Sequence, residues 1–412
     1  MTAPAGVRRG PLAPAYLSFV AATGLSSLGD AAWVLALTAS LVGTTSATAA
    51  GAVLALAGVP RVVALLGGGV VADRYGPVRV MVVADLLRGA VMVVAAVVVL
   101  AVGPSVPVLA VAAAALTVLG AFFVPASGAL RPLLLPEEQL VRGNALYLVG
   151  LRAGQAAGGP AGAGLLALGG VVAVAVANAA SFLVSAVAVA RARPVGAVAP
   201  VGRDGAARDS TGLRRRVAEG LRHVARDPGL RLLVLVVGLV ELAAAGPVNI
   251  GLVLLADAIG AGVPGAGLML TAFTAGATLA FVASLVWPVG RRAGAVLVAG
   301  VGAQAGVLAC LGLVGSLTGA LVGYGLLGLV TAQTGVVLTS LIQRRTPAGV
   351  RGRVMSIMSL VVFGAPLLGN VGIGVAVDLF GLTTTMVLHG LVAVAAVCAY
   401  ASSPILRGAR LD

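Results

Sequence analysis

Four charged residues, Asp30, Arg61, Arg152 and Glu241, interrupt long stretches of Ala, Val, Leu and Gly. Charges in so apolar a setting are costly, and they commonly serve a function. A carboxylate whose desolvation is balanced by a nearby cation can take up and release a proton as its surroundings change. No metal-ligand cluster and no nucleophile–base pair stands out, so these residue types indicate proton exchange, and we expect neither an enzyme nor a metal or cofactor site.

The spacing of Asp30 and Arg61 places them at similar depth on neighbouring helices. They lie 15 positions before and 16 positions after a turn near residue 45. We therefore expect a buried ion pair, which is either a permanent strut or a pair that breaks when Asp30 takes up a proton. Arg152 is a competitor for Asp30. Glu241 is a second candidate proton site, with a carboxylate hydrogen-bonded between helices as the alternative.

The remaining charges near apolar stretches have simpler interpretations. Asp85 and Arg88 are three positions apart, which predicts a local pair on one helix face. Asp257 and Asp378 fall at the outer ends of helices, where water reaches them, and we assign them no role. His389 is isolated in an apolar stretch and is predicted to be packed.

The elements that position these residues are transmembrane helices. The chain has 412 residues, 60% of them hydrophobic and 10% charged, whereas soluble domains carry about 25% charged residues. A helix needs about 20 apolar residues to span a bilayer. The apolar runs, rich in Ala and Leu and without strand-like alternation, predict twelve such helices. They fall near 15–43, 48–72, 80–102, 107–130, 144–168, 171–190, 231–257, 264–288, 294–315, 318–342, 354–380 and 383–404.

All 27 basic residues are arginines, and their placement predicts the topology. Without lysine there is no Walker A phosphate loop, so ATP hydrolysis by that loop is excluded. Alternate connections hold arginines and the others hold none, which by the positive-inside rule places both termini in the cytoplasm. The net charge of +14 is thereby explained as a topology signal, without nucleic-acid binding.

A polar linker of residues 191–230 divides the chain into an N-terminal half, 1–190, and a C-terminal half, 231–412. It predicts a cytoplasmic connection, with an amphipathic helix near 213–224 on anionic lipid as one interpretation. Val141-Arg142-Gly143 recurs as Val350-Arg351-Gly352, entering the fifth and eleventh apolar runs. Such internal symmetry is typical of secondary transporters built from repeats, whose substrate site lies between the halves. The fold class is therefore all-α, with two pseudo-symmetric bundles of six transmembrane helices.

The turn after the second run, Gly69-Val-Val-Ala-Asp73-Arg74-Tyr-Gly76, resembles the signature loop of the major facilitator superfamily. The resemblance implies a cytoplasmic latch in which Asp73 faces a helix end of the opposite half. A solvated turn with a surface ion pair is the alternative.

The fifth run carries a second resemblance. Glycines recur every four residues from Gly150 to Gly162, a spacing that lets two helix backbones approach closely. A stripe that also contains a Gly-Pro is similar to the antiporter signature of the superfamily's drug exporters. Simple helix packing explains the stripe equally well. The residues assigned to this antiporter-like helix are Gly154, Gly158, Gly159, Pro160 and Gly162.

Taken whole, the chain resembles the macrolide and siderophore exporters of this superfamily. The resemblance rests on Ser27-Leu-Gly-Asp30, Asp85-Leu-Leu-Arg88 and Arg351-Gly-Arg-Val-Met-Ser356. It implies a monomer in a bacterial inner membrane that exports a small, largely apolar compound in exchange for protons. An uptake permease of the same fold and a non-transporting sensor or scaffold remain as alternatives.

Overall fold

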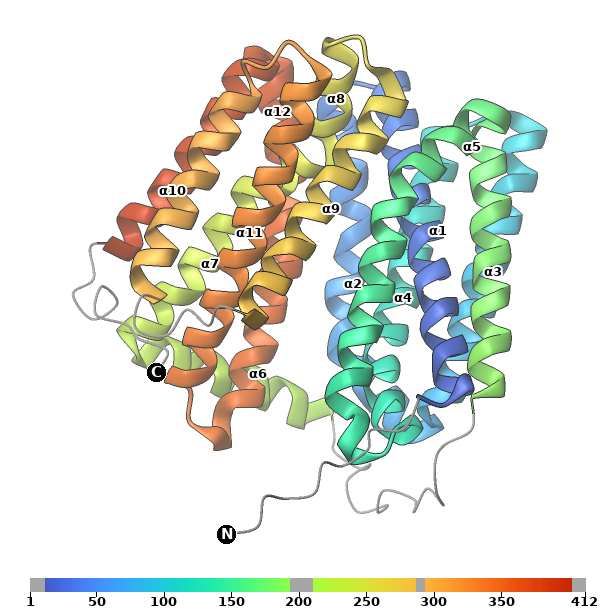
Figure 1. The fold of residues 1–412 in the computed structure, drawn as a ribbon, viewed down its shortest axis with the longest axis vertical. Helices are drawn as coiled ribbons and strands as arrows, with labels where there is room; N and C mark the ends of the chain where they lie inside the picture. The colour runs from blue at the N-terminus through green and yellow to red at the C-terminus, as the bar shows by residue number, and fades with distance from the viewer. Residues whose placement is uncertain (1–11, 193–209, 287–292, 402–412) are drawn as a thin grey trace.

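The structure is a computed structural model, and it describes residues 12–192, 210–286 and 293–401. These residues form helices joined by short turns (Figure 1). In chain order the elements are α1 (Pro14–Thr44), α2 (Ala47–Tyr75), α3 (Pro77–Val102), α4 (Val106–Leu134), η1 (Glu137–Gln139), α5 (Leu140–Arg191), α6 (Ser210–Arg226), α7 (Pro228–Gly246), η3 (Pro247–Gly251), α8 (Leu252–Ala258), α9 (Gly262–Val286), α10 (Ala293–Leu311), α11 (Leu317–Arg345) and α12 (Ala348–Ala401).

Two of these helices are double. In α5 the backbone leaves helical geometry at Gly169 and Gly170, and in α12 at Gly381. Gly170 and Gly381 have φ of 64° and 76°, a left-handed region that glycine enters without a steric penalty. Each is a reversal between two antiparallel helices, with no polar loop between them.

The predicted twelve-helix architecture in two bundles is therefore confirmed. In the described part of the chain, nine segments are long and apolar enough to cross a membrane. Two of the nine are the double helices α5 and α12, and α2 is the twelfth helix. Figure 1 shows α1–α5 in one bundle and α7–α12 in the other.

The seventh span is interrupted by a π-turn, η3, between α7 and α8. Such a turn contains one residue more than the regular helix and leaves a backbone carbonyl to be satisfied elsewhere. The buried Tyr324 hydroxyl donates a hydrogen bond to the Pro247 carbonyl oxygen at 2.9 Å. Within the turn, the Asn249 amide donates to Asn370 Oδ1 on α12 at 3.1 Å. Side chains from neighbouring helices thus hold the turn in place.

The first bundle is built on a close seam between α1 and α5. A Cβ at Gly154 would overlap the carbonyl oxygen of Gly24, and one at Gly162 would overlap the backbone of Ala32. Without side chains between them, the two backbones gain packing contacts that lipid tails cannot supply. This seam fixes α1, and with it Asp30.

The two ends of the molecule differ in charge, and the names arginine-rich end and arginine-poor end are used for them below. Arg74 and Arg142 lie at the arginine-rich end. The hairpins at Gly170 and Gly381 and the α1–α2 turn lie at the other. The assignment of the arginine-rich end to the cytoplasm stays a prediction.

The bundles contact each other along two helix pairs, α2 with α12 and α5 with α9. At the first pair, a Cβ at Gly51 would overlap the Asn370 carbonyl oxygen. At the second, a Cβ at Gly159 would overlap that of Gly267. The Thr271 hydroxyl also donates to the Ala156 carbonyl at 2.6 Å. In Figure 1 the ribbons converge towards the arginine-poor end and diverge towards the arginine-rich end. This is the arrangement of a molecule closed at the arginine-poor end.

The linker between the halves contains a helix, α6, which covers the amphipathic helix predicted near 213–224. It packs on α12 and α7, and Glu219 forms an ion pair with Arg353 at 3.1 Å. A Cβ at Gly220 would press on the backbone of Arg353. α6 is therefore fastened to the second bundle. The division into domains at 190 and 231, and contact of α6 with lipid, stay predictions.

Candidate functional site

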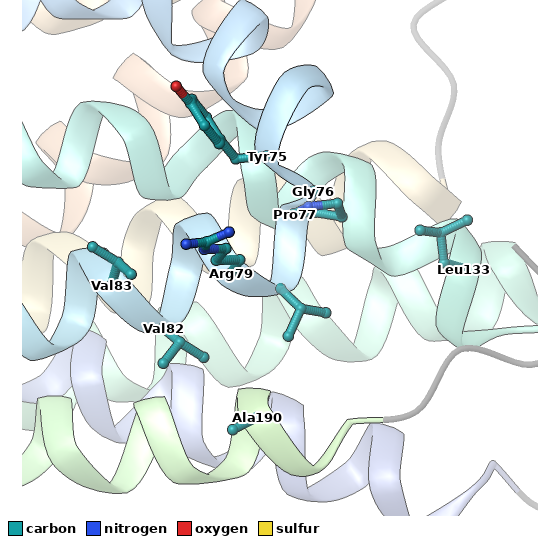
Figure 2. Close-up of a pocket in the computed structure, with 9 residues that line it drawn as sticks. Tyr75, Gly76, Pro77, Arg79, Val82, Val83, Leu133 and Ala190 are labelled. Carbon is teal, nitrogen blue, oxygen red and sulfur yellow. The ribbon is translucent and has the colours of Figure 1, made fainter. Parts of the chain in front are cut away.

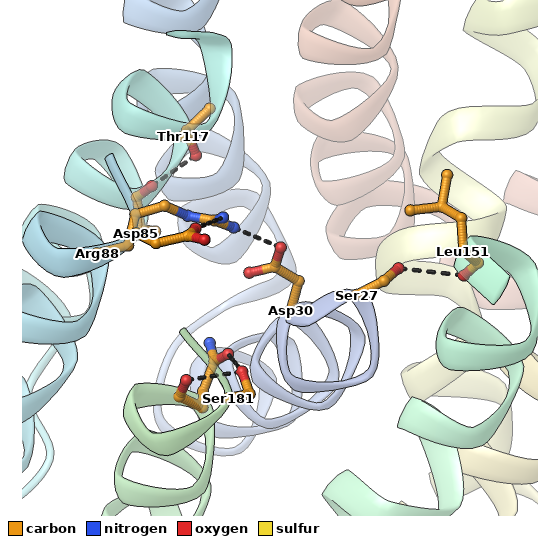
Figure 3. Close-up of polar contacts among 9 residues, drawn as sticks. Ser27, Asp30, Asp85, Arg88, Thr117, Leu151 and Ser181 are labelled. Atoms are coloured by element: carbon orange, nitrogen blue, oxygen red, sulfur yellow. Dashed lines mark hydrogen bonds and ion pairs between the residues drawn. The ribbon is translucent and has the colours of Figure 1, made fainter. Parts of the chain in front are cut away.

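The charged cluster in the first bundle is a triad of Asp30, Arg88 and Asp85 (Figure 3). Arg88 Nη2 contacts Asp30 Oδ2 at 2.5 Å, and Arg88 Nη1 contacts Asp85 Oδ1 at 3.2 Å. The side chain of Asp85 is 0% exposed and that of Arg88 is 7% exposed, whereas that of Asp30 is 40% exposed. Asp30 is therefore the solvent-accessible end of the triad.

Neighbouring helices hold this triad in a fixed position. The Arg88 guanidinium lies 3.9 Å from the ring centroid of Phe182 on α5. Gly29, beside Asp30, leaves space for Asn178 and Ser181 of α5, which a Cβ would overlap. As Figure 3 shows, Ser27 is directed to the other side of α1, where its hydroxyl donates to the Leu151 carbonyl at 3.2 Å. These contacts orient α1 so that Asp30 points towards α3.

The expected ion pair between Asp30 and Arg61 is wrong, because Asp30 pairs with Arg88 instead. Arg61 extends from α2 across to the second bundle, where its guanidinium lies 4.5 Å from the ring centroid of Phe363 on α12. Its Nε is buried and makes no hydrogen bond in the described part of the structure. Similar depth in the membrane stays a prediction, and depth does not determine which helix face carries a side chain.

The local pair predicted for Asp85 and Arg88 is confirmed. Sequence reasoning missed that Arg88 also reaches Asp30 on another helix. A signal was present in the sequence, since an arginine carries five N–H donors and can contact two carboxylates at once.

Arg152 does not compete for Asp30 either. Its Nη1 donates to Gln155 Oε1 at 2.9 Å, and its guanidinium lies 5.2 Å from the ring centroid of Phe281 on α9. Arg61 and Arg152 thus share one arrangement, an arginine of the first bundle placed over a phenylalanine of the second. Both sit towards the arginine-rich side of the closest helix contacts, where the bundles begin to separate.

Glu241 lies on α7, near the middle of the span Pro228–Ala258, and is partly buried. Among the residues that the structure describes, it has no hydrogen-bond or ion-pair partner. The adjacent Val240 carbonyl accepts a hydrogen bond from the buried Gln304 at 3.3 Å. In the described part of the structure, the Glu241 carboxylate is therefore not hydrogen-bonded to a neighbouring helix. Proton exchange at Glu241 stays a prediction.

Asp378, to which the sequence assigned no role, joins the two bundles. It lies on α12 three residues before the reversal at Gly381. Its Oδ2 accepts a hydrogen bond from the Thr48 backbone N–H at 2.9 Å, and its Oδ1 accepts one from Ala47 at 3.3 Å. A carboxylate of the second bundle thus caps the first turn of α2 in the first bundle.

Comparison with known proteins identifies the family. The model of the Major Facilitator Superfamily matches residues 17–365, which is most of the chain. The chain belongs to the Major Facilitator Superfamily. It is therefore a multi-pass membrane transporter, without an enzymatic role. No curated relative matches it in sequence.

Solved structures of other members share this fold. The nucleoside transporter NupG superposes with a TM-score of 0.73 at 13% identity, over 95% of this chain and 99% of that one. The D-xylose-proton symporter gives 0.70 at 16% identity, over 96% and 99%. A bacterial homolog of the human lysosomal transporter Spinster, in an inward-facing and occupied conformation, gives 0.68 at 16%, over 94% and 95%. At such identities the likeness concerns the fold alone.

The turn that resembles the signature loop of the superfamily lies at the arginine-rich end. Gly76, with φ of 82°, ends α2 and begins α3, and the Arg74 guanidinium lies 5.4 Å from the ring centroid of Tyr75. Gly69 and the side chain of Asp73 fall outside the described residues, so the latch stays a prediction. An open, mainly apolar groove of about 470 Å³ lies around this turn and is lined also by Val83. Figure 2 shows its lining residues. No residue of the triad lines it.

The glycine stripe of α5 has two faces in this transporter. Gly154, Gly158 and Gly162 form the seam with α1, as helix packing alone requires. Gly159 instead lies against Gly267 of the second bundle, next to Pro160. The resemblance to an antiporter signature therefore stays a prediction, and it concerns the face that meets the other bundle. In the described part of the chain, no group of His, Cys, Asp and Glu is arranged to hold a metal ion.

Proposed function

We propose that this transporter exports a small, largely apolar compound in exchange for protons, by alternating access. The observation that carries the proposal is the Asp30–Arg88–Asp85 triad. One arginine between two aspartates leaves one negative charge, which a proton or a second cation neutralises. Asp30 is the accessible member, and Arg61 lies on α2, the next helix of the same bundle.

Coupling follows from which groups face Asp30 in each conformation. Arg61 spans from α2 to Phe363 of the second bundle, so movement between the bundles moves this guanidinium relative to Asp30. With Arg61 near, the ionised carboxylate is favoured more strongly than with Arg61 withdrawn, when Arg88 alone lies beside it. The protonation of Asp30 thereby follows the conformation, as proton-coupled transport requires.

The direction of transport rests on the resemblance to drug exporters in α5 and on the apolar composition of the spans. Aromatic residues make up only 4% of the chain. This composition favours a compound held by aliphatic packing over one held by aromatic stacking. Orientation with the arginine-rich end in the cytoplasm is part of the proposal.

The test is accumulation of fluorescent dyes and antibiotics in a bacterium that lacks its own efflux pumps. Wild type is compared with Asp30→Asn at equal membrane expression, with and without a protonophore. We expect lower accumulation with wild type alone, abolished by the protonophore. Higher accumulation with wild type would show an importer. Equal flux by Asp30→Asn and wild type would remove Asp30 from the proton path.

A further inference from the structure

We propose that Asp378 is a clamp that holds the arginine-poor end shut, and that it thereby sets the balance between the two conformations of the transporter. The clamp consists of the Asp378 carboxylate on α12 and the first turn of α2. It goes beyond the proposed function, because it acts equally in an exporter and in an importer.

The first turn of α2 depends on the opposite bundle for its hydrogen bonds. The first N–H groups of a helix have no partner within the helix. Here Ser46 caps only one of them, with its hydroxyl oxygen accepting from Ala49 N–H at 3.2 Å. Those of Ala47 and Thr48 donate to Asp378. The first turn of α2 contains no acidic residue of its own. Two of its three capped donors thus rely on a side chain from the other half of the molecule.

The position of Asp378 within its own helix supports this role. It occupies the C-terminal turn of the first half of α12, where the helix dipole disfavours a negative charge. The N-terminus of α2 is the positive end of that helix's dipole, which favours a negative charge. The unfavourable interaction between the Asp378 carboxylate and the dipole of α12 is therefore offset only while the N-terminus of α2 lies against this carboxylate.

The backbones around the clamp are packed closely enough to make it specific. A Cβ at Gly374, one turn before Asp378, would overlap the Ala47 carbonyl oxygen. One turn further on α2, Gly51 lies against Asn370, which is 6% exposed. Opening this end requires α2 and α12 to separate, and both hydrogen bonds to Asp378 then break. The carboxylate therefore stabilises the closed arrangement and contributes nothing to the open one.

The experiment measures how often this end opens. Cys310 and Cys398 are first replaced by serine, and Asn370→Cys is introduced as a reporter buried between α2 and α12. The alkylation rate of this thiol by a soluble maleimide, in lipid nanodiscs, is proportional to the open population when reclosing is fast. A second reporter, Leu308→Cys, lies in the core of the second bundle at 0% exposure and responds only to unfolding.

In Asp378→Asn the amide oxygen can still accept one N–H, so the negative charge and one hydrogen bond are lost, which corresponds to about a 2- to 30-fold change in an equilibrium. We therefore expect Asp378→Asn to accelerate alkylation at residue 370 by about that factor, with no change at residue 308. Asp378→Glu, which keeps the carboxylate, is expected to restore most of the slow rate. Asp257→Asn is the matched control. Asp257 is also an exposed aspartate at the arginine-poor end of a helix, and it has no partner in the described residues.

Two results would overturn the proposal. An unchanged rate at residue 370 in Asp378→Asn would show that the carboxylate does not hold this end shut. An equal increase at residues 370 and 308 would show that the substitution only destabilises the fold. Neither result bears on the direction of transport or on Asp30.

Discussion

At the scale of single residues, Arg88 is the centre of the charged cluster, because it is the only described cation in direct contact with either Asp30 or Asp85. Removing it would leave Asp85 buried without a counter-charge. Breaking a buried pair in this way costs about 3–5 kcal/mol. We expect Arg88→Gln to lower the thermal stability of the purified protein strongly.

The control for this prediction also removes the charge of Asp85, which Arg88→Gln leaves buried without a partner. Arg88→Gln combined with Asp85→Asn is expected to recover much of the lost stability, because both sites are then neutral. Thermal unfolding followed by intrinsic fluorescence gives the comparison. A double variant no more stable than Arg88→Gln alone would show that the loss comes from packing on Phe182 and not from charge.

A second residue-scale prediction concerns Asp227, outside the membrane spans. Its carboxylate caps α7 through Gly229 and Leu230 N–H, and accepts hydrogen bonds from Arg345 Nε at 2.8 and 2.9 Å. Partial burial acts to raise the pKa of Asp227, but these hydrogen bonds outweigh it, so the pKa lies below its ordinary value. A lowered pKa means that the ionised carboxylate stabilises the folded state.

The sign of the pH dependence follows. The stabilisation is complete above the ordinary aspartate pKa and is lost as the pH falls through the lower folded value. We expect Asp227→Asn to cost about 1 kcal/mol near neutral pH, because Asn still caps the helix but lacks the negative charge that the helix N-terminus and Arg345 favour. The difference in melting temperature between wild type and Asp227→Asn should shrink as the medium is acidified below about pH 4. A difference independent of pH would contradict this account.

At the scale of elements, the seam between α1 and α5 is the most sensitive to added volume. Gly154→Ala places a methyl group against the Gly24 carbonyl, and overpacking of this kind costs about 1–3 kcal/mol. Gly164, on the same helix, has open space where its Cβ would lie. We expect Gly154→Ala to lower the melting temperature and Gly164→Ala to leave it unchanged or raised. Equal changes in melting temperature for Gly154→Ala and Gly164→Ala would mean that α1 and α5 can move apart to accommodate the added methyl group.

The elements themselves were largely predictable from the sequence, because apolar length determines a transmembrane helix. The run predicted at 171–190 is the second half of α5, and that at 383–404 corresponds to the second half of α12. The site was less predictable. Counting positions predicts a similar depth for Asp30 and Arg61 but does not tell which helix face each occupies, so Arg88 was missed as the partner. Asp378 was set aside as a solvated helix end, since its partner on α2 lies more than 300 residues away.

At the scale of the whole molecule, the two ends of the bundles must face opposite sides of the membrane. With Cys310 and Cys398 replaced by serine, single cysteines at Thr384 and Gly352 report on the arginine-poor and arginine-rich ends, where both residues are exposed. In intact cells we expect an impermeant maleimide to label Thr384→Cys and not Gly352→Cys. A permeant maleimide should label both. The reverse pattern for the impermeant reagent would invert the proposed topology and the direction of export.

The π-turn in the seventh span has a consequence for the internal symmetry of the chain. α1, the matching helix of the first half, runs from Pro14 to Thr44 without such a turn. The extra residue in η3 rotates everything beyond it by about 100° relative to a regular helix. An alignment of the two halves therefore needs a one-residue gap near 247–251. Asn249, which meets Asn370, belongs to the part of the second repeat that the first repeat lacks.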